Sequence, residues 1–232
     1  MELEYIKRNT DAIRKRMENA KDRAGRSGDD VSLVAAVKYA DVDEIRYLCE
    51  HCGVTEIGEN RVQQLLEHYE ALECRDGINW HFIGTLQTNK VKYIIDKVSM
   101  IHSLDSVKLA AEIDRQAKKH GIVMDVLVEI NSGAEESKSG VLPEELEAFC
   151  EDIERFENIN HRGFMTMAPK CEKKEDYLKY FQQTYRQVLD IWAKKRHNIS
   201  KPVISMGMSD SFEEAIASGS DIVRVGRGLF LK

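Results

Sequence analysis

The sequence predicts an α/β protein, a single (β/α)8 TIM-type barrel with an additional N-terminal helix. Short apolar runs alternate with amphipathic stretches along the chain, and this alternation is typical of parallel strands joined by helices. Eight such runs occur in 232 residues, and each is followed by a helical pattern except the last, which precedes a short stub. No low-complexity linker divides the chain, so we expect one domain over residues 1–232.

The predicted elements follow one another in a regular order. Charged and apolar residues at helical spacing predict a first helix within residues 1–26, packed on the barrel. Strands are predicted within 32–40, 54–59, 78–84, 99–105, 122–131, 159–169, 201–209 and 220–226. Helices are predicted within 41–53, 60–73, 87–98, 106–121, 142–157, 174–196 and 210–219.

Start and stop signals support these helices. We expect N-caps at Asp41, Asp105 and Asp210, and Pro143 in a first turn. An open, doubly wound sheet is the alternative fold, but it requires a glycine-rich turn after the first strand, and none is present. Three glycines lie after predicted helices: Gly53, Gly121 and Gly219.

Composition excludes several classes of protein. The formal net charge of −6 gives no basic excess, so we expect no nucleic-acid partner. No run of about 18 apolar residues predicts a membrane span, and the N-terminal stretch has no signal-peptide core. An odd number of cysteines, five, without framework spacing indicates a reducing compartment, so we expect a cytoplasmic protein.

The segment CEHC, from Cys49 to Cys52, has the spacing of a metal or redox motif. A structural zinc site would need a second ligand pair at finger-like spacing, and none follows. The segment also ends a helical pattern that Gly53 closes, so we interpret both cysteines as ordinary helix-terminal residues. No other cluster has metal-ligand spacing, and we expect no metal.

The strand ends hold the candidate chemistry, because active sites of such barrels lie at the carboxyl ends of the strands. Lys38 sits near the end of the apolar run LVAAVKYA, where burial would favour the neutral amine. A neutral amine is a nucleophile that forms a Schiff base with a carbonyl. From the lysine alone, a side chain that snorkels to solvent is the better interpretation.

The loops after the seventh and eighth strands suit a phosphate. Ser209 lies where a helix begins, and RVGRG places Gly226 and Gly228 beside Arg224 and Arg227. A lysine amine opposite a phosphate site suggests pyridoxal 5'-phosphate (PLP), which carries an aldehyde and a phosphate on one ring. A PLP-free Schiff-base aldolase acting on a phosphorylated sugar is a third class, disfavoured because such lysines usually lie on a late strand.

Long motifs give the sequence a family resemblance. VAAVKYA, IGENRVQQL, WHFIGTLQTNK, IHSLDS, RGFMTMAP and SMGMSDSFEEAIASGSDIVRVG resemble, in order and spacing, the pyridoxal phosphate homeostasis protein family. The resemblance covers nearly the whole chain after the first helix. It implies a barrel like the barrel domain of bacterial alanine racemases, with bound PLP. It also implies a role in intracellular PLP supply and amino-acid balance, without established catalytic turnover.

The resemblance assigns most of the predicted cofactor contacts. Lys38 matches the lysine that holds PLP as an internal aldimine, and Ser209 matches the phosphate-binding serine. The main-chain amides of Gly226 and Arg227 match further phosphate donors. Arg224 matches the arginine that faces the pyridine nitrogen in racemase-like barrels.

Two further contacts rest on the same resemblance. Met167 falls where the racemases place a histidine against the cofactor ring, and Asn60 belongs to the GEN motif beside the cofactor. The chain departs from the family pattern at Arg227, where many members have a small hydroxyl residue, and at Tyr39. Its end, GLFLK, predicts a short or absent final helix.

The same features favour a carrier over an enzyme, and we predict no catalytic residue. In alanine racemases one base comes from a second domain of a partner chain, for which this sequence leaves no room, so we also expect a monomer. A cationic Arg224 disfavours a protonated pyridine nitrogen, which weakens the ring as an electron sink. Apo PLP-dependent enzymes are the expected recipients. A racemase-like enzyme of low activity is the alternative.

Three other side chains are secondary candidates. Lys138, in the loop after the fifth strand, is either an amine for cofactor exchange or a solvated lysine, with the second reading favoured. His81 and His102 lie in predicted strands, where alternate side chains point inward. Each would touch the cofactor or fill the barrel, and the structural role is favoured.

Overall fold

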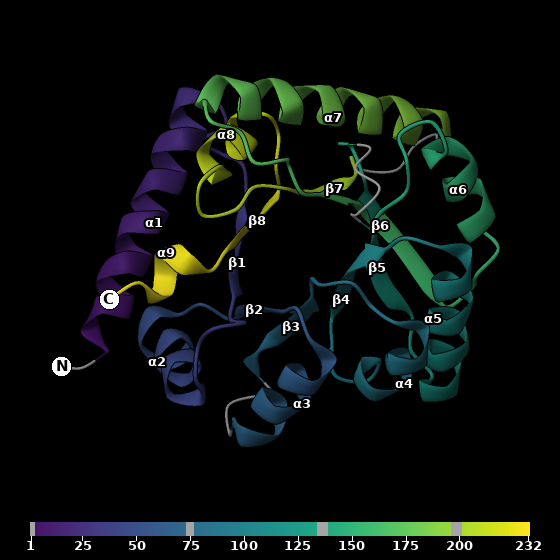
Figure 1. Ribbon diagram of the computed structural model, residues 1–232, viewed down its shortest axis with the longest axis horizontal. Helices are drawn as coiled ribbons and strands as arrows, with labels where there is room; N and C mark the ends of the chain where they lie inside the picture. Colours follow the sequence, from purple (N-terminus) through teal and green to yellow (C-terminus); the bar gives the residue numbers. More distant parts are fainter. Residues whose placement is uncertain (1–2, 73–76, 134–138, 196–200) are drawn as a thin grey trace.

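Eight parallel strands close into a barrel in the order β1 to β8, and β1 pairs with β8 to complete the ring. The computed structural model describes residues 3–72, 77–133, 139–195 and 201–232. Figure 1 shows the strands around the centre and the helices outside them. The strands are β1 (Ser32–Ala36), β2 (Glu56–Glu59), β3 (Asn79–Phe82), β4 (Met100–Leu104), β5 (Met124–Ile130), β6 (Ile159–Thr166), β7 (Val203–Ser205) and β8 (Ile222–Val225).

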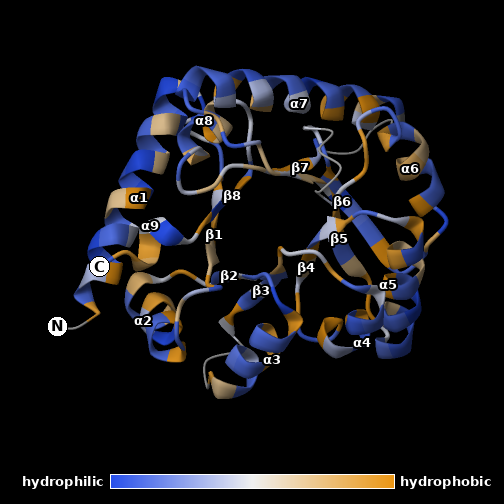
Figure 2. Cartoon of the chain, in the orientation of Figure 1, coloured by the Kyte–Doolittle hydropathy of each residue, from blue (hydrophilic) through white to orange (hydrophobic). Residues whose placement is uncertain are grey.

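The helices form the outer ring, and Figure 2 shows hydrophilic residues along much of it. A short 3-10 turn, Thr88–Lys90, precedes the fourth helix. The helices are α1 (Glu4–Arg23), α2 (Val42–Cys52), α3 (Val62–Ala71), α4 (Val91–Ile94), α5 (Val107–His120), α6 (Leu146–Ile153), α7 (Lys174–Lys195), α8 (Phe212–Ala217) and α9 (Arg227–Phe230). The predicted barrel with its additional N-terminal helix is therefore confirmed.

The N-terminal helix α1 lies in the outer ring between α8 and α2 and also contacts α9 (Figure 1). The helix after β8 has only four residues, as the stub at the end of the sequence predicts. Ile6, Ile13 and Met17 recur at helical spacing and are buried against the core. The helix α1 thus covers apolar surface that α9 is too short to cover.

Side-chain caps begin the helices α2 and α5, and the observed helix starts correct three predictions. Asp41 caps α2 in a full capping box, in which Glu44 donates its main-chain N–H to the Asp41 side chain over 2.8 Å. The cap of α5 is Ser106 rather than Asp105, and α8 follows Ser211 rather than Asp210. Pro143 lies in the turn before α6, not in its first turn. As predicted, three glycines follow helices: Gly53, Gly121 and Gly219.

The described residues also bear on the cysteines, on metal ligands and on membrane spans. Cys49 and Cys52 lie in the last turns of α2, as the helical pattern predicts, and burial raises the pKa of the Cys52 thiol. Among the described residues, no group of three or more potential ligands could hold a metal ion. Within the same residues, no helix is both long and apolar enough to cross a membrane.

Candidate functional site

A pocket of about 430 Å³ opens at the carboxyl ends of the strands. It lies where the segments after β1, β2, β6, β7 and β8 converge. All seven residues predicted to contact a cofactor line this pocket: Lys38, Asn60, Met167, Ser209, Arg224, Gly226 and Arg227. Residues far apart in sequence thus meet at one hollow, although their roles as cofactor ligands stay predictions.

Lys38 lies in the turn that follows β1 and is exposed. The strand ends at Ala36, so Lys38 lies beyond it, and its exposure agrees with the interpretation of a side chain that reaches solvent rather than with a buried amine. Val37 is buried under the turn, whereas the Lys38 ammonium lies 4.7 Å from the centroid of the Tyr39 ring. Gln64 donates a hydrogen bond to the Lys38 main-chain oxygen over 2.9 Å, which fixes the turn against α3. The amine therefore lies at the rim of the pocket, within reach of solvent.

The segments after β7 and β8 contact each other and together form one wall of the pocket. The Gly228 N–H donates to the Ser209 hydroxyl over 3.4 Å. A Cβ atom on Gly226 would lie 2.8 Å from the main-chain oxygen of Ala36, so this close approach requires glycine. The Arg227 guanidinium pairs with Asp210, and both side chains are exposed.

Arg224 is a buried cation in the floor of the pocket. Its side chain donates to the Ser205 hydroxyl over 2.6 Å and to the Thr166 main-chain oxygen over 3.0 Å. Burial lowers the pKa of Arg224 to about 10, and the charge of Glu129 opposes this shift. The guanidinium therefore stays cationic at neutral pH. The partners Ser205 and Thr166 were not predicted. The inward position of Ser205 on β7 is a signal that could have identified it, whereas Thr166 accepts through its main-chain oxygen, which the side-chain pattern does not reveal.

His81 and His102 lie inside the barrel, and neither lines the pocket. The nitrogens His81 Nδ1 and His102 Nε2 are 2.9 Å apart, and His102 Nδ1 is 3.1 Å from the Ser205 hydroxyl. Burial, together with the nearby Arg224 charge, holds the pKa of His102 well below its usual range. Both rings thus fill the barrel with their nitrogens bonded, which is the favoured structural role.

Comparison with known proteins identifies the relatives of this chain. The family model for the alanine racemase N-terminal domain matches residues 8–232. The pyridoxal phosphate homeostasis protein of Aquifex aeolicus is 45% identical over 218 residues, which cover 94% of each chain. This chain belongs to the pyridoxal phosphate homeostasis protein family.

Solved structures agree with this assignment. PipY of Synechococcus elongatus, in a structure with PLP bound, matches with a TM-score of 0.77 and 28% identity, covering 86% of this chain and 92% of that one. An alanine racemase of Clostridium difficile matches with a TM-score of 0.72 at 18% identity, covering 96% of this chain and 56% of that one. The racemase likeness shows the shared barrel fold alone.

The GEN motif of this family member is anchored by its glutamate. Glu59 is fully buried, and its carboxylate lies 2.6 Å from His68 Nδ1 and 3.2 Å from the Asn60 N–H. This support for Asn60 was not predicted. From the other side, Gly84 packs so closely that a Cβ atom there would lie 2.2 Å from the Asn60 main-chain oxygen.

The substitution Gly84→Ala should therefore displace Asn60. We expect the free energy of unfolding to fall by about 1–3 kcal/mol, the range for overpacking, and the pocket to lose affinity for its ligand. Chemical denaturation and PLP titration measure the two effects. Gly28→Ala is the matched control, because a Cβ atom there meets nothing within 4 Å. Equal effects of both substitutions would contradict this account.

His102 should make stability depend on pH. Its folded-state pKa is below the unfolded value of about 6.5, so as pH falls the unfolded chain binds a proton that the folded chain does not. Stability from this group is therefore lost on acidification. We expect the difference in unfolding free energy between the wild type and His102→Gln to change by up to about 1.4 kcal/mol per pH unit below 6.5. A constant difference between pH 7.5 and 5.5 in denaturation curves would contradict the buried, neutral ring.

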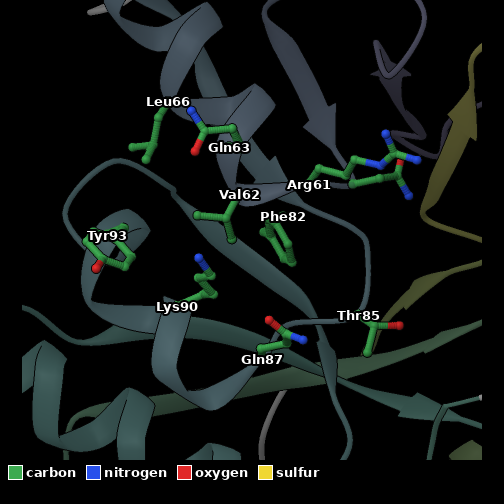
Figure 3. A pocket seen from close by; sticks show the side chains of 10 residues that line it. Arg61, Val62, Gln63, Leu66, Phe82, Thr85, Gln87, Lys90 and Tyr93 are labelled. Carbon is green, nitrogen blue, oxygen red and sulfur yellow. The ribbon is translucent and has the colours of Figure 1, made fainter.

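A second hollow, of about 570 Å³, adjoins the site, and Asn60 lines both. Its walls come from α3, the end of β3 and the segment through Thr88–Lys90. Figure 3 shows Lys90 pointing its nitrogen toward Val62, with Arg61 and Tyr93 at opposite sides of the view. No prediction from the sequence concerns this hollow. The remaining sequence candidate, Lys138, lies outside the described residues.

Proposed function

We propose that this protein binds PLP in the pocket at the carboxyl ends of the strands and delivers it to other proteins. The observation that carries this proposal is the convergence of an amine, a buried guanidinium and a hydroxyl–amide wall on one hollow of about 430 Å³. The volume lies within the range of small-ligand sites. Membership of the PLP homeostasis family and the PLP-bound relative support the same ligand.

The donor set fits the functional groups of PLP. Lys38 would be the covalent attachment point for the aldehyde group, because a lysine amine is the nucleophile suited to a carbonyl. Ser209 and the amides of Gly226 and Arg227 would bind the phosphate. Asn60 and Met167 would contact the ring. PLP supplies an electrophilic aldehyde and an electron-withdrawing ring when it is bound.

Arg224 and Lys38 support a carrier rather than a catalyst. A guanidinium that stays cationic at neutral pH disfavours a second positive charge beside it, so we assign Arg224 the place next to the pyridine nitrogen. The exposed amine of Lys38 leaves the attachment point open to attack by an incoming amine. We therefore propose a monomeric cytoplasmic carrier whose recipients are apo PLP-dependent enzymes, with a slow racemase-like enzyme as the alternative.

Transfer and turnover measured side by side separate the two functions. The PLP-loaded protein is mixed with an apo PLP-dependent enzyme, and recovery of that enzyme's activity is compared with recovery in an equal concentration of free PLP. Amino-acid racemisation by the loaded protein is measured in parallel. Transfer without racemisation supports the carrier. Racemisation at ordinary enzymatic rates (kcat of about 1 s⁻¹ or more), abolished by Lys38→Ala, would overturn it.

A further inference from the structure

Five polar side chains form a continuous hydrogen-bonded chain through the interior of the barrel. Arg224 on β8 bonds to Ser205 on β7 over 2.6 Å, and Ser205 to His102 on β4 over 3.1 Å. His102 bonds to His81 on β3 over 2.9 Å, and His81 to Glu56 on β2 over 2.7 Å. In Figure 1, β7 and β8 lie across the ring from β3 and β4, so the chain crosses the barrel interior.

The two ends of this chain lie at opposite ends of the barrel. Arg224 lines the proposed PLP pocket at the carboxyl ends of the strands. Glu56 is the first residue of β2 and lines a separate hollow of about 410 Å³, whose walls include Arg14 and Glu18 of α1. Glu56 can therefore exchange with solvent at a face that the proposed ligand does not touch.

The donors and acceptors fix one direction along the chain. A carboxylate only accepts, so a neutral His81 donates from Nε2 to Glu56 and keeps Nδ1 as an acceptor. His102 then donates from Nε2 to His81 Nδ1, and its bare Nδ1 accepts the Ser205 O–H. Ser205 in turn accepts from Arg224, because a guanidinium has no acceptor. The reverse arrangement would place a bare His81 nitrogen against the Glu56 carboxylate. Hydrogen bonds from His81 and Asn79 lower the pKa of Glu56, which keeps that carboxylate charged.

We propose that Glu56 is a positioning residue for the PLP pocket, because its carboxylate sets the tautomers of both histidines and thereby the bond that holds Arg224. A hydroxyl that donates to one partner becomes a stronger acceptor for the other, so Ser205 binds Arg224 most strongly when its proton points to His102. Outside the hydrogen-bonded series, the charge of Glu129 acts on Arg224, and the charge of Asp105 acts on Glu129. The predicted tautomers depend on the hydrogen-bonded side chains alone, whereas the expected change in PLP affinity rests on the proposed function.

The substitution Glu56→Gln tests the direction of the chain. Asn79 donates to Glu56 Oε1 over 2.6 Å and would hold the carbonyl oxygen of the new amide, leaving its NH2 group toward His81. His81 Nε2 must then accept, so both rings should switch their proton from Nε2 to Nδ1. Proton–nitrogen correlation NMR on protein labelled with 15N-histidine reads the tautomer of each ring. Glu18→Gln, in the same hollow but outside the chain, is the control and should leave both tautomers unchanged.

The same variants test the positioning role. We expect Glu56→Gln to weaken PLP binding by between about twofold and thirtyfold, the range for remote residues in a coupled network, and Glu18→Gln to leave it unchanged. Switched tautomers with unchanged PLP affinity would overturn the positioning role. If Glu56→Gln does not fold, the wild-type spectrum still decides, because a proton on Nδ1 of either ring at neutral pH overturns the direction. A wild type that binds no PLP would refute the proposed function and leave the tautomer result standing.

Discussion

Replacing Lys38 with alanine should abolish covalent capture of PLP and leave the fold intact. The lysine supplies the only atom in the proposed site that forms a bond to the aldehyde, so its loss leaves noncovalent contacts alone. We expect the visible absorbance of bound PLP to disappear and the affinity to fall about tenfold or more, which corresponds to ~1.4 kcal/mol or more. Because Lys38 is exposed, the free energy of unfolding should change by less than about 0.5 kcal/mol.

The control for this prediction is another exposed lysine beside an aromatic ring. The Lys90 ammonium lies 5.7 Å from the centroid of the Tyr93 ring, in the hollow that adjoins the site. Lys90→Ala should retain the absorbance and the affinity. Borohydride reduction followed by peptide mass spectrometry locates the attachment. A label at a residue other than Lys38, or full absorbance in Lys38→Ala, would refute the assignment.

The pocket was predictable from the sequence because the topology of a parallel barrel determines where the strand ends lie. In a parallel barrel all strands end on one face, so residues after the strands meet regardless of their separation along the chain. Lys38 and Ser209 could therefore be placed on that face before the structure was known. The end of the first strand at Ala36 could not, because an apolar run does not show where its strand stops and its turn begins.

The interior of the barrel was less predictable. Ser205 and His102 are 103 positions apart, and their contact depends on strand register and tilt, which one sequence does not specify. Alternation indicates which residues point inward but not which of them meet. The N-cap prediction at Asp105 was wrong for a related reason. Asp105 and Ser106 are both good N-cap residues, and main-chain geometry selects the serine.

Arg224 carries the second large expected effect, because it belongs to both the pocket and the interior. In Arg224→Met, the Ser205 hydroxyl and the Thr166 carbonyl lose their donor in a buried place that methionine cannot satisfy. Each unsatisfied group costs about 1–3 kcal/mol, so we expect the free energy of unfolding to fall by about 2–6 kcal/mol. The affinity for PLP should fall as well. Denaturant unfolding and PLP titration measure these losses.

Taking a cation out of water is costly, and apolar replacements of buried charges sometimes stabilise a protein. We do not expect stabilisation here, because the polar partners of Arg224 remain after the substitution without their donor. Arg227→Met is the control, since Arg227 forms an exposed pair with Asp210 that should contribute less than about 1 kcal/mol. If Arg224→Met raised the free energy of unfolding while the affinity for PLP fell, the arginine would serve ligand binding although it destabilises the fold.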